Sequence, residues 1–134
     1  MNDELMRAAF RNAKTIAVVG LSDKSHRASY RIAHYLQQQG YRIVPVNPNV
    51  EQVLGEQAYP DLASVPGTVD FVDIFRRSEY VGPIVDQAIA KGVQTIWMQM
   101  GVSDRIAAQR AEAAGITVVM NRCAMVDHGR LMRG

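Results

Sequence analysis

Residues 20–29 carry the side chains best suited to hold a phosphorylated ligand. The segment reads Gly-Leu-Ser-Asp-Lys-Ser-His-Arg-Ala-Ser and follows a short apolar run that ends at Val19. A glycine turn between a strand and a helix presents free backbone N–H groups, and the helix dipole attracts anions to the same place. Hydroxyl groups and two cations add further donors at Ser22, Lys24, Ser25, Arg27 and Ser29. Together with Gly20, these residues predict a site for phosphate groups.

Two common phosphate-binding motifs do not fit this segment. A dinucleotide site needs the pattern G-x-G-x-x-G and an acid near the end of the second strand, which binds the ribose hydroxyls. Here only Gly20 stands in place, and the second expected strand ends in Asn47-Pro48. The nucleoside-triphosphate pattern G-x-x-x-x-G-K-[ST] is also missing. The ligand is therefore expected to be phosphorylated but to be neither NAD nor ATP. The alternative is that a serine only caps the helix and the two cations face solvent.

Short apolar runs, in part β-branched, predict buried strands at residues 15–19, 41–46, 69–75, 95–98 and 116–120. Helical periodicity predicts helices at residues 4–11, 29–39, 79–91 and 104–114. A short helical turn is expected before the third strand, and a loop or short helix after residue 120. This alternation predicts an α/β fold, a three-layer Rossmann-like domain with a five-stranded parallel sheet in the order 3-2-1-4-5. Residues 1–134 are expected to form this one domain.

The carboxyl ends of the strands gather the residues that could do chemistry. In an open parallel sheet the ligand crevice lies beyond those ends, beside the point where the strand order reverses. The segments that follow the five strand ends are residues 20–29, 47–49, 75–77, 99–103 and 121–123. Asp70 and Asp73 belong to the third strand, where we expect a sheet-end or solvent-facing pair with no reaction attached. Trp97, Met98 and Met100 are expected to divide between a ligand pocket and the core.

Composition and charge exclude several classes of function. Apolar residues make up 48% of the chain and charged residues 21%, as in an average globular protein. No apolar run is long enough to cross a bilayer, and the first residues do not resemble a secretory signal, so we expect no membrane contact and a cytoplasmic location. A formal net charge of +2 is too small for the dense basic face of a nucleic-acid-binding protein. One cysteine, and histidines without ligand spacing, predict no internal disulfide and no structural metal.

Several segments resemble one protein family over nearly the whole chain. They are VVGLSDKSHRASYRIAHYL, YRIVPVNPNVEQVLG, VDFVDIFRR, TIWMQMGV and VVMNRCAMVDHGRL. In order and spacing they resemble the small stand-alone coenzyme A-binding domain family, which is similar to the amino-terminal coenzyme A-binding domain of the succinyl-CoA synthetase α subunit. The resemblance implies a Rossmann-like fold and coenzyme A or an acyl-CoA as the ligand.

The resemblance also implies which residues touch the ligand. The phosphates would be surrounded by Gly20, Ser22, Lys24, Arg27 and Ser29. The nucleotide would be bordered by Asn47 and Pro48, with Phe75 and Arg76 across the crevice. Gln99, Met100 and Gly101 resemble the turn after the fourth strand of the synthetase. Asn121 and Cys123 resemble its Asn-x-Cys turn. The chain departs from the pattern at residues 25–29, where the family usually has Pro-Gly-Arg-Pro-Ser, and at Val50, where the synthetase has a lysine.

These residues leave three functions open. The first is a coenzyme A or acyl-CoA binding module without a reaction of its own, which senses the cofactor or presents it to an unidentified protein partner. Ligase activity in isolation is not expected, because the synthetases carry their phosphorylated histidine in another domain. The second is an enzyme in which Cys123, as a thiolate, acts on coenzyme A thioesters or disulfides. The third is an NAD(P)-dependent oxidoreductase, for which the glycine fingerprint is missing.

Overall fold

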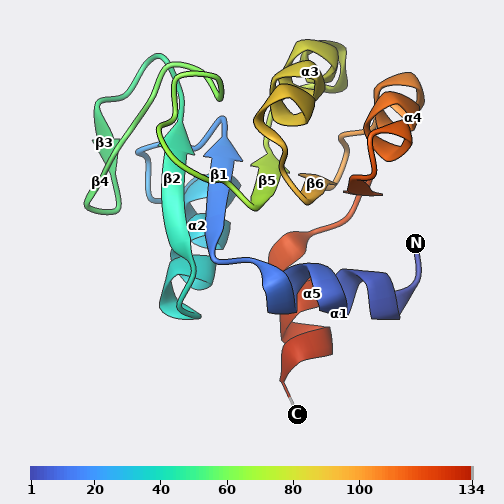
Figure 1. Cartoon of the computed structure of the whole chain (residues 1–134). Coiled ribbons are helices and arrows are strands. Elements are labelled where there is room, and N and C mark those ends of the chain that lie inside the picture. Colours follow the sequence, from blue (N-terminus) through green and yellow to red (C-terminus); the bar gives the residue numbers. More distant parts are fainter. Residues whose placement is uncertain (134) are drawn as a thin grey trace.

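A five-stranded parallel sheet forms the centre of the molecule. The computed structural model describes residues 1–133, and its sheet contains β1 (Thr15–Val19), β2 (Arg42–Val46), β5 (Phe71–Ile74), β6 (Thr95–Met98) and β7 (Thr117–Val119). Neighbouring strands run parallel in the order β2-β1-β5-β6-β7 (Figure 1). Every residue of β5 and β6 is buried, Asp73 and Thr95 included, so neither strand has the apolar and polar alternation of a strand with one exposed face.

Helices cover both faces of this sheet and complete three layers. One face carries α1 (Asp3–Asn12), α2 (Ala28–Gln38) and α5 (Ala124–Met132), and the other carries α3 (Val81–Lys91) and α4 (Arg105–Ala113) (Figure 1). A 3₁₀ turn, η1 (Ser78–Tyr80), leads into α3. On the first face the rings of Phe10, Phe71 and Trp97 pack together, with centroids 5.1 to 5.9 Å apart.

Local chemistry sets the helix ends. The side chain of Asn2 accepts a hydrogen bond from Leu5 N and caps α1, and the side chain of Asp104 accepts one from Ala107 N and caps α4. Helix α3 ends at Gly92, whose φ of 75° lies in the left-handed region that glycine adopts without strain. The four helices that periodicity predicted begin and end within about two residues of the observed bounds.

The α/β class, the five strands and their parallel direction are confirmed, but the expected strand order 3-2-1-4-5 is wrong. The third of these strands along the chain, β5, pairs with β1 and β6 instead of lying outside β2. Pro45 in β2 explains the difference, because proline lacks an N–H and is confined to edge strands. The Pro45 carbonyl accepts a hydrogen bond from Tyr59 N at 3.0 Å, on the side of β2 away from β1.

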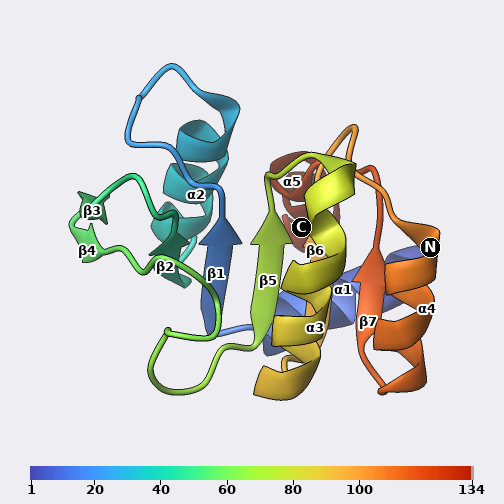
Figure 2. The same cartoon turned by 90° about the horizontal axis from the view of Figure 1, so that it is seen from above.

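The corrected order moves the ligand crevice. The direction of strand succession reverses between β1 and β5, so the switch point lies between these two strands. At that point Gly20 has a φ of +87°, and a Cβ atom placed on it would lie 2.9 Å from the Phe75 carbonyl oxygen. Only glycine fits this contact. In the view from above, the loop that follows β1 extends beyond the end of the strand (Figure 2).

Two segments differ from the sequence-based expectation. Residues 52–57 form a small antiparallel hairpin of β3 (Gln52–Val53) and β4 (Glu56–Gln57), which the sequence analysis did not predict. Residues 60–68 form bends and turns in place of the expected helical turn. Their path brings Tyr59 beside Val46 and carries the chain from β2 over to β5.

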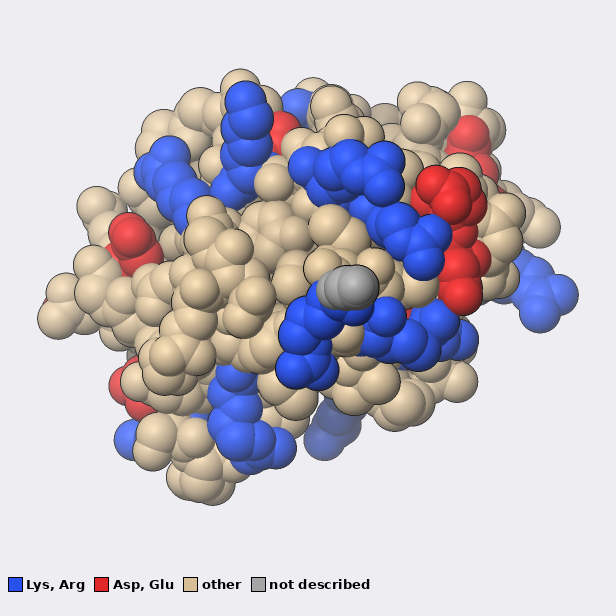
Figure 3. Space-filling view, turned by 90° about the horizontal axis from the view of Figure 1, so that it is seen from below, with Lys and Arg blue, Asp and Glu red and all other residues tan. Residues whose placement is uncertain are grey.

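The last helix is longer than the expected loop or short helix. Helix α5 packs against α1 and is joined to it by Arg130, which donates to both carboxylate oxygens of Asp3 at 2.9 and 3.1 Å. Figure 3 shows the face around the C-terminal residues, where Lys and Arg side chains are numerous and acidic side chains form a band at one side. No helix within residues 1–133 has the length and apolar character needed to cross a membrane.

Candidate functional site

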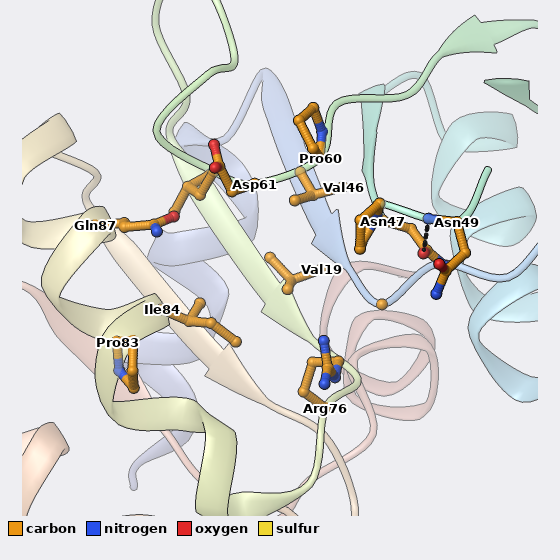
Figure 4. Close-up of a pocket in the computed structure, with 13 residues that line it drawn as sticks. Val19, Val46, Asn47, Asn49, Pro60, Asp61, Arg76, Pro83, Ile84 and Gln87 are labelled. Carbon is orange, nitrogen blue, oxygen red and sulfur yellow. Dashed lines mark hydrogen bonds between the residues drawn. The ribbon is translucent and has the colours of Figure 1, made fainter. Parts of the chain in front are cut away.

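A pocket, here called the α3-side pocket, opens between α3 and the carboxyl ends of β1 and β2. Its volume is about 380 Å³, and it is lined by Val19, Gly20, Val46, Asn47, Pro48, Asn49, Pro60, Asp61, Leu62, Arg76, Pro83, Ile84 and Gln87. Apolar side chains form its middle, with Val19, Val46 and Ile84 directed into it (Figure 4). Arg76 and Asn47 lie toward one end, and Asp61 and Gln87 lie toward the other (Figure 4).

Polar groups at the strand ends are held in place by short contacts. The Asn47 side chain donates through Nδ2 to the Leu21 carbonyl at 3.0 Å and accepts from Asn49 N at 2.9 Å (Figure 4). This ties the turn after β2 to the loop after β1. Arg76 follows β5, and its guanidinium carbon lies 4.7 Å from the centroid of the Tyr80 ring. The stacking holds a cation at the edge of the pocket, next to Gly20.

The loop after β1, residues 20–27, is closed by its own hydroxyl groups. Ser29 is buried in the first turn of α2, and its Oγ accepts a hydrogen bond from Ser22 N at 3.0 Å. The Oγ of Ser22 in turn accepts from Lys24 N at 3.0 Å. Arg27 is the N-cap of α2 and makes no side-chain capping bond, so the serine cap of the alternative interpretation does not start this helix. The Lys24 side chain is 67% exposed.

A second cavity, here called the α5-side cavity, lies on the other face of the sheet at the same strand ends. Its volume is about 290 Å³, and it is lined by Ala28, Arg31, Ile32, Phe75, Gln99, Met100, Cys123 and Met125. Arg31 donates to the His26 carbonyl at 2.5 Å. The remaining lining is mostly carbon and sulfur. Trp97 and Met98 do not contribute to it, because both are fully buried in the core.

Hydrogen bonds fix the turn after β7, residues 121–123, to the turn after β6. Asn121 has a φ of 58°, and its Oδ1 accepts from Gly101 N at 2.6 Å. The Arg122 carbonyl accepts from Trp97 Nε1 at 2.8 Å. Ala124 N, at the start of α5, donates to the Oε1 of buried Gln99 at 3.0 Å. Gly101 and Asn121 therefore have a structural role that the sequence did not reveal.

Two buried aspartates near the strand ends differ in their electrostatic setting. Asp127 accepts two hydrogen bonds from Arg122, at 2.6 and 2.9 Å, and these, with a bond from Arg130, lower its pKa. Asp73 is fully buried in β5 without a hydrogen-bond partner, and burial raises its pKa well above the usual range. The expectation that Asp73 faces solvent is therefore wrong. Asp70 does lie at a sheet end, where it accepts from Lys14 N and Thr15 N.

The structure divides the sequence-predicted site residues into groups. The α3-side pocket is lined by Gly20, Asn47, Pro48 and Arg76. The α5-side cavity is lined by Phe75, Gln99, Met100 and Cys123. The loop after β1 holds Ser22, Lys24 and Arg27, and Ser29 lies in the first turn of α2. Within residues 1–133, no group of three or more His, Cys, Asp or Glu side chains has the arrangement of a metal site.

Sequence reasoning missed the wall of the pocket that comes from α3 and residues 60–62. Pro60, Ile84 and Gln87 line it because β5 lies beside β1, which places α3 over the switch point. The incorrect strand order concealed this wall. Pro45 was the signal that could have corrected it, since a proline inside β2 argues against an interior position for that strand.

Comparison with known proteins agrees with this architecture. The protein of unknown function YneT of Bacillus subtilis is 35% identical over 123 residues, which cover 92% of this chain and 91% of YneT. A solved structure from Pyrococcus horikoshii, a hypothetical protein, superimposes with a TM-score of 0.95 at 38% identity and covers 99% of this chain and 94% of its own. The α subunit of an ADP-forming acetate–CoA ligase from Pyrococcus furiosus is 32% identical over 88 residues, 65% of this chain but 19% of that subunit. Residues 14–129 match the model of the CoA binding domain. The chain therefore belongs to the CoA-binding domain family.

Proposed function

We propose that the chain binds coenzyme A, free or acylated, across the carboxyl ends of β1, β2 and β5, and has no reaction of its own. The observation that supports this most is that the loop of residues 20–27 joins three features in a chain of this family. They are the α3-side pocket, the start of α2 and the guanidinium of Arg76. A phosphorylated nucleotide needs an apolar hollow, backbone donors and a cation within one ligand length.

The phosphates lie at the first loop in this proposal. The first N–H groups of α2 have no partner within the helix, and the Arg27 side chain does not cap them. Anions are stabilised at such an end by the helix dipole. Lys24 and Arg27 are exposed beside it and add charge-assisted hydrogen bonds. Ser22 and Ser29 contribute by bonding to each other, which shapes the loop.

The nucleoside lies in the α3-side pocket. A volume of about 380 Å³ suits a purine nucleoside, and Val19, Val46 and Ile84 offer apolar contact to its ring. Gln87 accepts from Ala63 N at 3.2 Å through Oε1, so its amide nitrogen is the group that donates to a ring nitrogen. The Asp61 carboxylate, at the same end, suits the exocyclic amine of adenine. Neither residue is an acid at the end of β2, the position that holds a ribose in NAD-binding folds.

The setting of Cys123 favours binding over catalysis. A nucleophilic cysteine needs a base within hydrogen-bond reach. The cavity around Cys123 is lined by apolar side chains, Arg31 and Gln99, and Gln99 Oε1 already accepts from Ala124 N. His128 is buried farther along α5, where its Nδ1 shares a hydrogen bond with the Tyr35 hydroxyl at 2.8 Å. We therefore propose that the chain presents the cofactor to a protein partner.

Isothermal titration calorimetry with coenzyme A tests this function. The Lys24→Ala/Arg27→Ala double variant is expected to bind at least tenfold more weakly, with a shallower dependence of Kd on salt concentration. The matched control is Arg11→Ala/Arg42→Ala, which removes the same charge from exposed positions at the opposite edge of the sheet. Equal affinities of both double variants would place the phosphates elsewhere, and a wild-type protein without affinity for coenzyme A would overturn the proposed function.

A further inference from the structure

The α5-side cavity has the chemistry of a pocket for an aliphatic chain. Its lining includes the apolar side chains of Ile32, Phe75, Met100 and Met125, and its volume is about 290 Å³. An apolar cavity of about 150 Å³ is already large enough to admit benzene. Methionine side chains are unbranched and flexible, so a wall built from them adapts to chains of different length.

The position of this cavity connects it to the proposed phosphate site. Ala28, the first residue of α2, lines the cavity, so the helix end that would hold the phosphates is also the cavity wall. Phe75 lines the α5-side cavity and Arg76 lines the α3-side pocket. The two hollows therefore open on either side of a single peptide unit, against which Gly20 packs.

A ligand with its phosphates at α2 can reach both hollows. Its nucleoside extends into the α3-side pocket and its opposite end toward α5. At that end the Gln99 side chain, which is 4% exposed and anchored through its Oε1 to Ala124 N, presents its amide in the wall. An amide donor beside an apolar hollow matches a thioester carbonyl followed by a hydrocarbon chain.

We infer that the α5-side cavity binds the acyl group of a coenzyme A thioester, with a chain of about four to eight carbons, and that Met125 limits the chain length. The inference rests on the proposed function, since it places the acyl end of the same ligand. Free coenzyme A leaves this apolar surface uncovered, and the thioester covers it. Each buried methylene favours binding by transfer from water.

Calorimetric titrations with coenzyme A and with its butyryl, hexanoyl, octanoyl and palmitoyl thioesters test the inference. Hexanoyl-CoA is expected to bind at least tenfold more tightly than coenzyme A, and palmitoyl-CoA no more tightly than octanoyl-CoA. Met125→Trp fills the cavity, so the Kd for hexanoyl-CoA is expected to become nearly equal to the Kd for coenzyme A. Met125→Ala enlarges it and is expected to move the optimum to longer chains.

Val126→Trp provides the matched control, because Val126 is the next residue of α5, is 60% exposed and lies outside the cavity lining. This variant is expected to keep the wild-type preference for hexanoyl-CoA. Thermal melting confirms that each variant is folded before titration. If coenzyme A binds and the acyl chain changes nothing, or if Met125→Trp keeps the preference, the acyl assignment is wrong while the proposed function stands. If coenzyme A and its thioesters all fail to bind, the proposed function itself is overturned.

Discussion

The loop after β1 and the turn after β7 end at the same edge of the sheet but use their polar groups differently. In the turn, the side chains of Asn121 and Arg122 are engaged in hydrogen bonds to other parts of the protein, and Gln99 of the neighbouring turn bonds to Ala124 N at the start of α5. In the loop, Lys24 and Arg27 are exposed and the first N–H groups of α2 lack a side-chain cap. The turn therefore holds α5 in place, and the loop keeps its donors available for a ligand.

The comparison separates residues by what their loss should affect. Changes in the loop should alter ligand binding with little cost in stability, unless they disturb the one close backbone contact that the loop makes. Changes in the turn should lower stability and leave ligand affinity near the wild-type value.

Gly20→Val should have the largest effect, because it combines two costs. The new Cβ would lie 2.9 Å from the Phe75 carbonyl oxygen, and a φ of +87° is strained for a β-branched residue. We expect the free energy of unfolding to fall by about 3 kcal/mol. We also expect coenzyme A binding to be lost. Urea unfolding measures the first and calorimetry the second.

Gly40→Ala is the control for Gly20→Val. Gly40 also has a positive φ, +101°, but a Cβ placed there would meet no atom within 4 Å. Gly40→Ala should lower the free energy of unfolding by about 1 kcal/mol, through backbone strain alone. Equal losses for the two variants would show that the close contact at Gly20 does not matter.

Asp127→Ala removes the carboxylate that accepts hydrogen bonds from Arg122 of the turn and from Arg130 of α5. The Asp127 carboxylate is buried, while both arginines are partly exposed, so we expect a loss of about 2 kcal/mol. Because its pKa is lowered in the folded state, the wild-type advantage should be present above pH of about 4 and disappear as the pH falls through the folded-state pKa. Urea unfolding at several pH values measures this. An advantage that grows toward acid pH would contradict the assigned ion pairs.

Asp73→Asn tests whether Asp73 is buried as a protonated acid in β5, the strand that lies between the loop after β1 and the turn after β7. The pKa of Asp73 is raised by burial, so the folded state binds the proton more tightly than the unfolded chain. Wild-type stability should therefore fall as the pH rises above about 4, by up to about 1.4 kcal/mol for each unit of pKa difference. The variant should lack this decline, so its melting temperature relative to the wild type should increase as the pH rises above about 4. Parallel pH profiles would show that Asp73 is not buried as an acid.

Cys123→Ser should have the smallest effect. The sulfur lies in the α5-side cavity and is expected to make no contact that free coenzyme A requires. The melting temperature should change by about 1 °C or less, and the Kd for coenzyme A by less than about twofold. Loss of binding by a folded variant would instead favour a role for the thiol in holding or attacking the ligand.

The sequence predicted most helices and strands but not the order of the strands in the sheet. Apolar runs placed β1 and β6 at their observed bounds, because buried parallel strands have a simple pattern. Strand order depends on tertiary contacts, which is why β5 was misplaced, although Pro45 in β2 indicated an edge strand. Periodicity also could not show that Asp73 is buried, because burial at that position depends on the helices that cover the sheet.

Candidate site residues were predicted to different degrees. Gly20, Asn47 and Arg76 follow strands and could be assigned from the position of strand ends alone. Ile84 and Gln87 belong to the middle of α3, where nothing in the helix pattern distinguishes a pocket wall from a surface. Asn121 was predicted as a ligand contact from the family resemblance, and the structure adds a bond that the sequence did not indicate, from Gly101 N to its Oδ1, at a turn position with positive φ.

Thermal melting with equal concentrations of coenzyme A, coenzyme A lacking its 3′-phosphate, NAD and NADP tests the central claim most directly. A ligand that binds only the folded state, at about one hundred times its Kd, adds roughly 2.7 kcal/mol, which for this size of chain raises Tm by about 10 °C. Coenzyme A is expected to produce this shift, the dephosphorylated form a smaller one, and the nicotinamide cofactors little. Stabilisation by NAD or NADP without stabilisation by coenzyme A would contradict the account of the whole crevice.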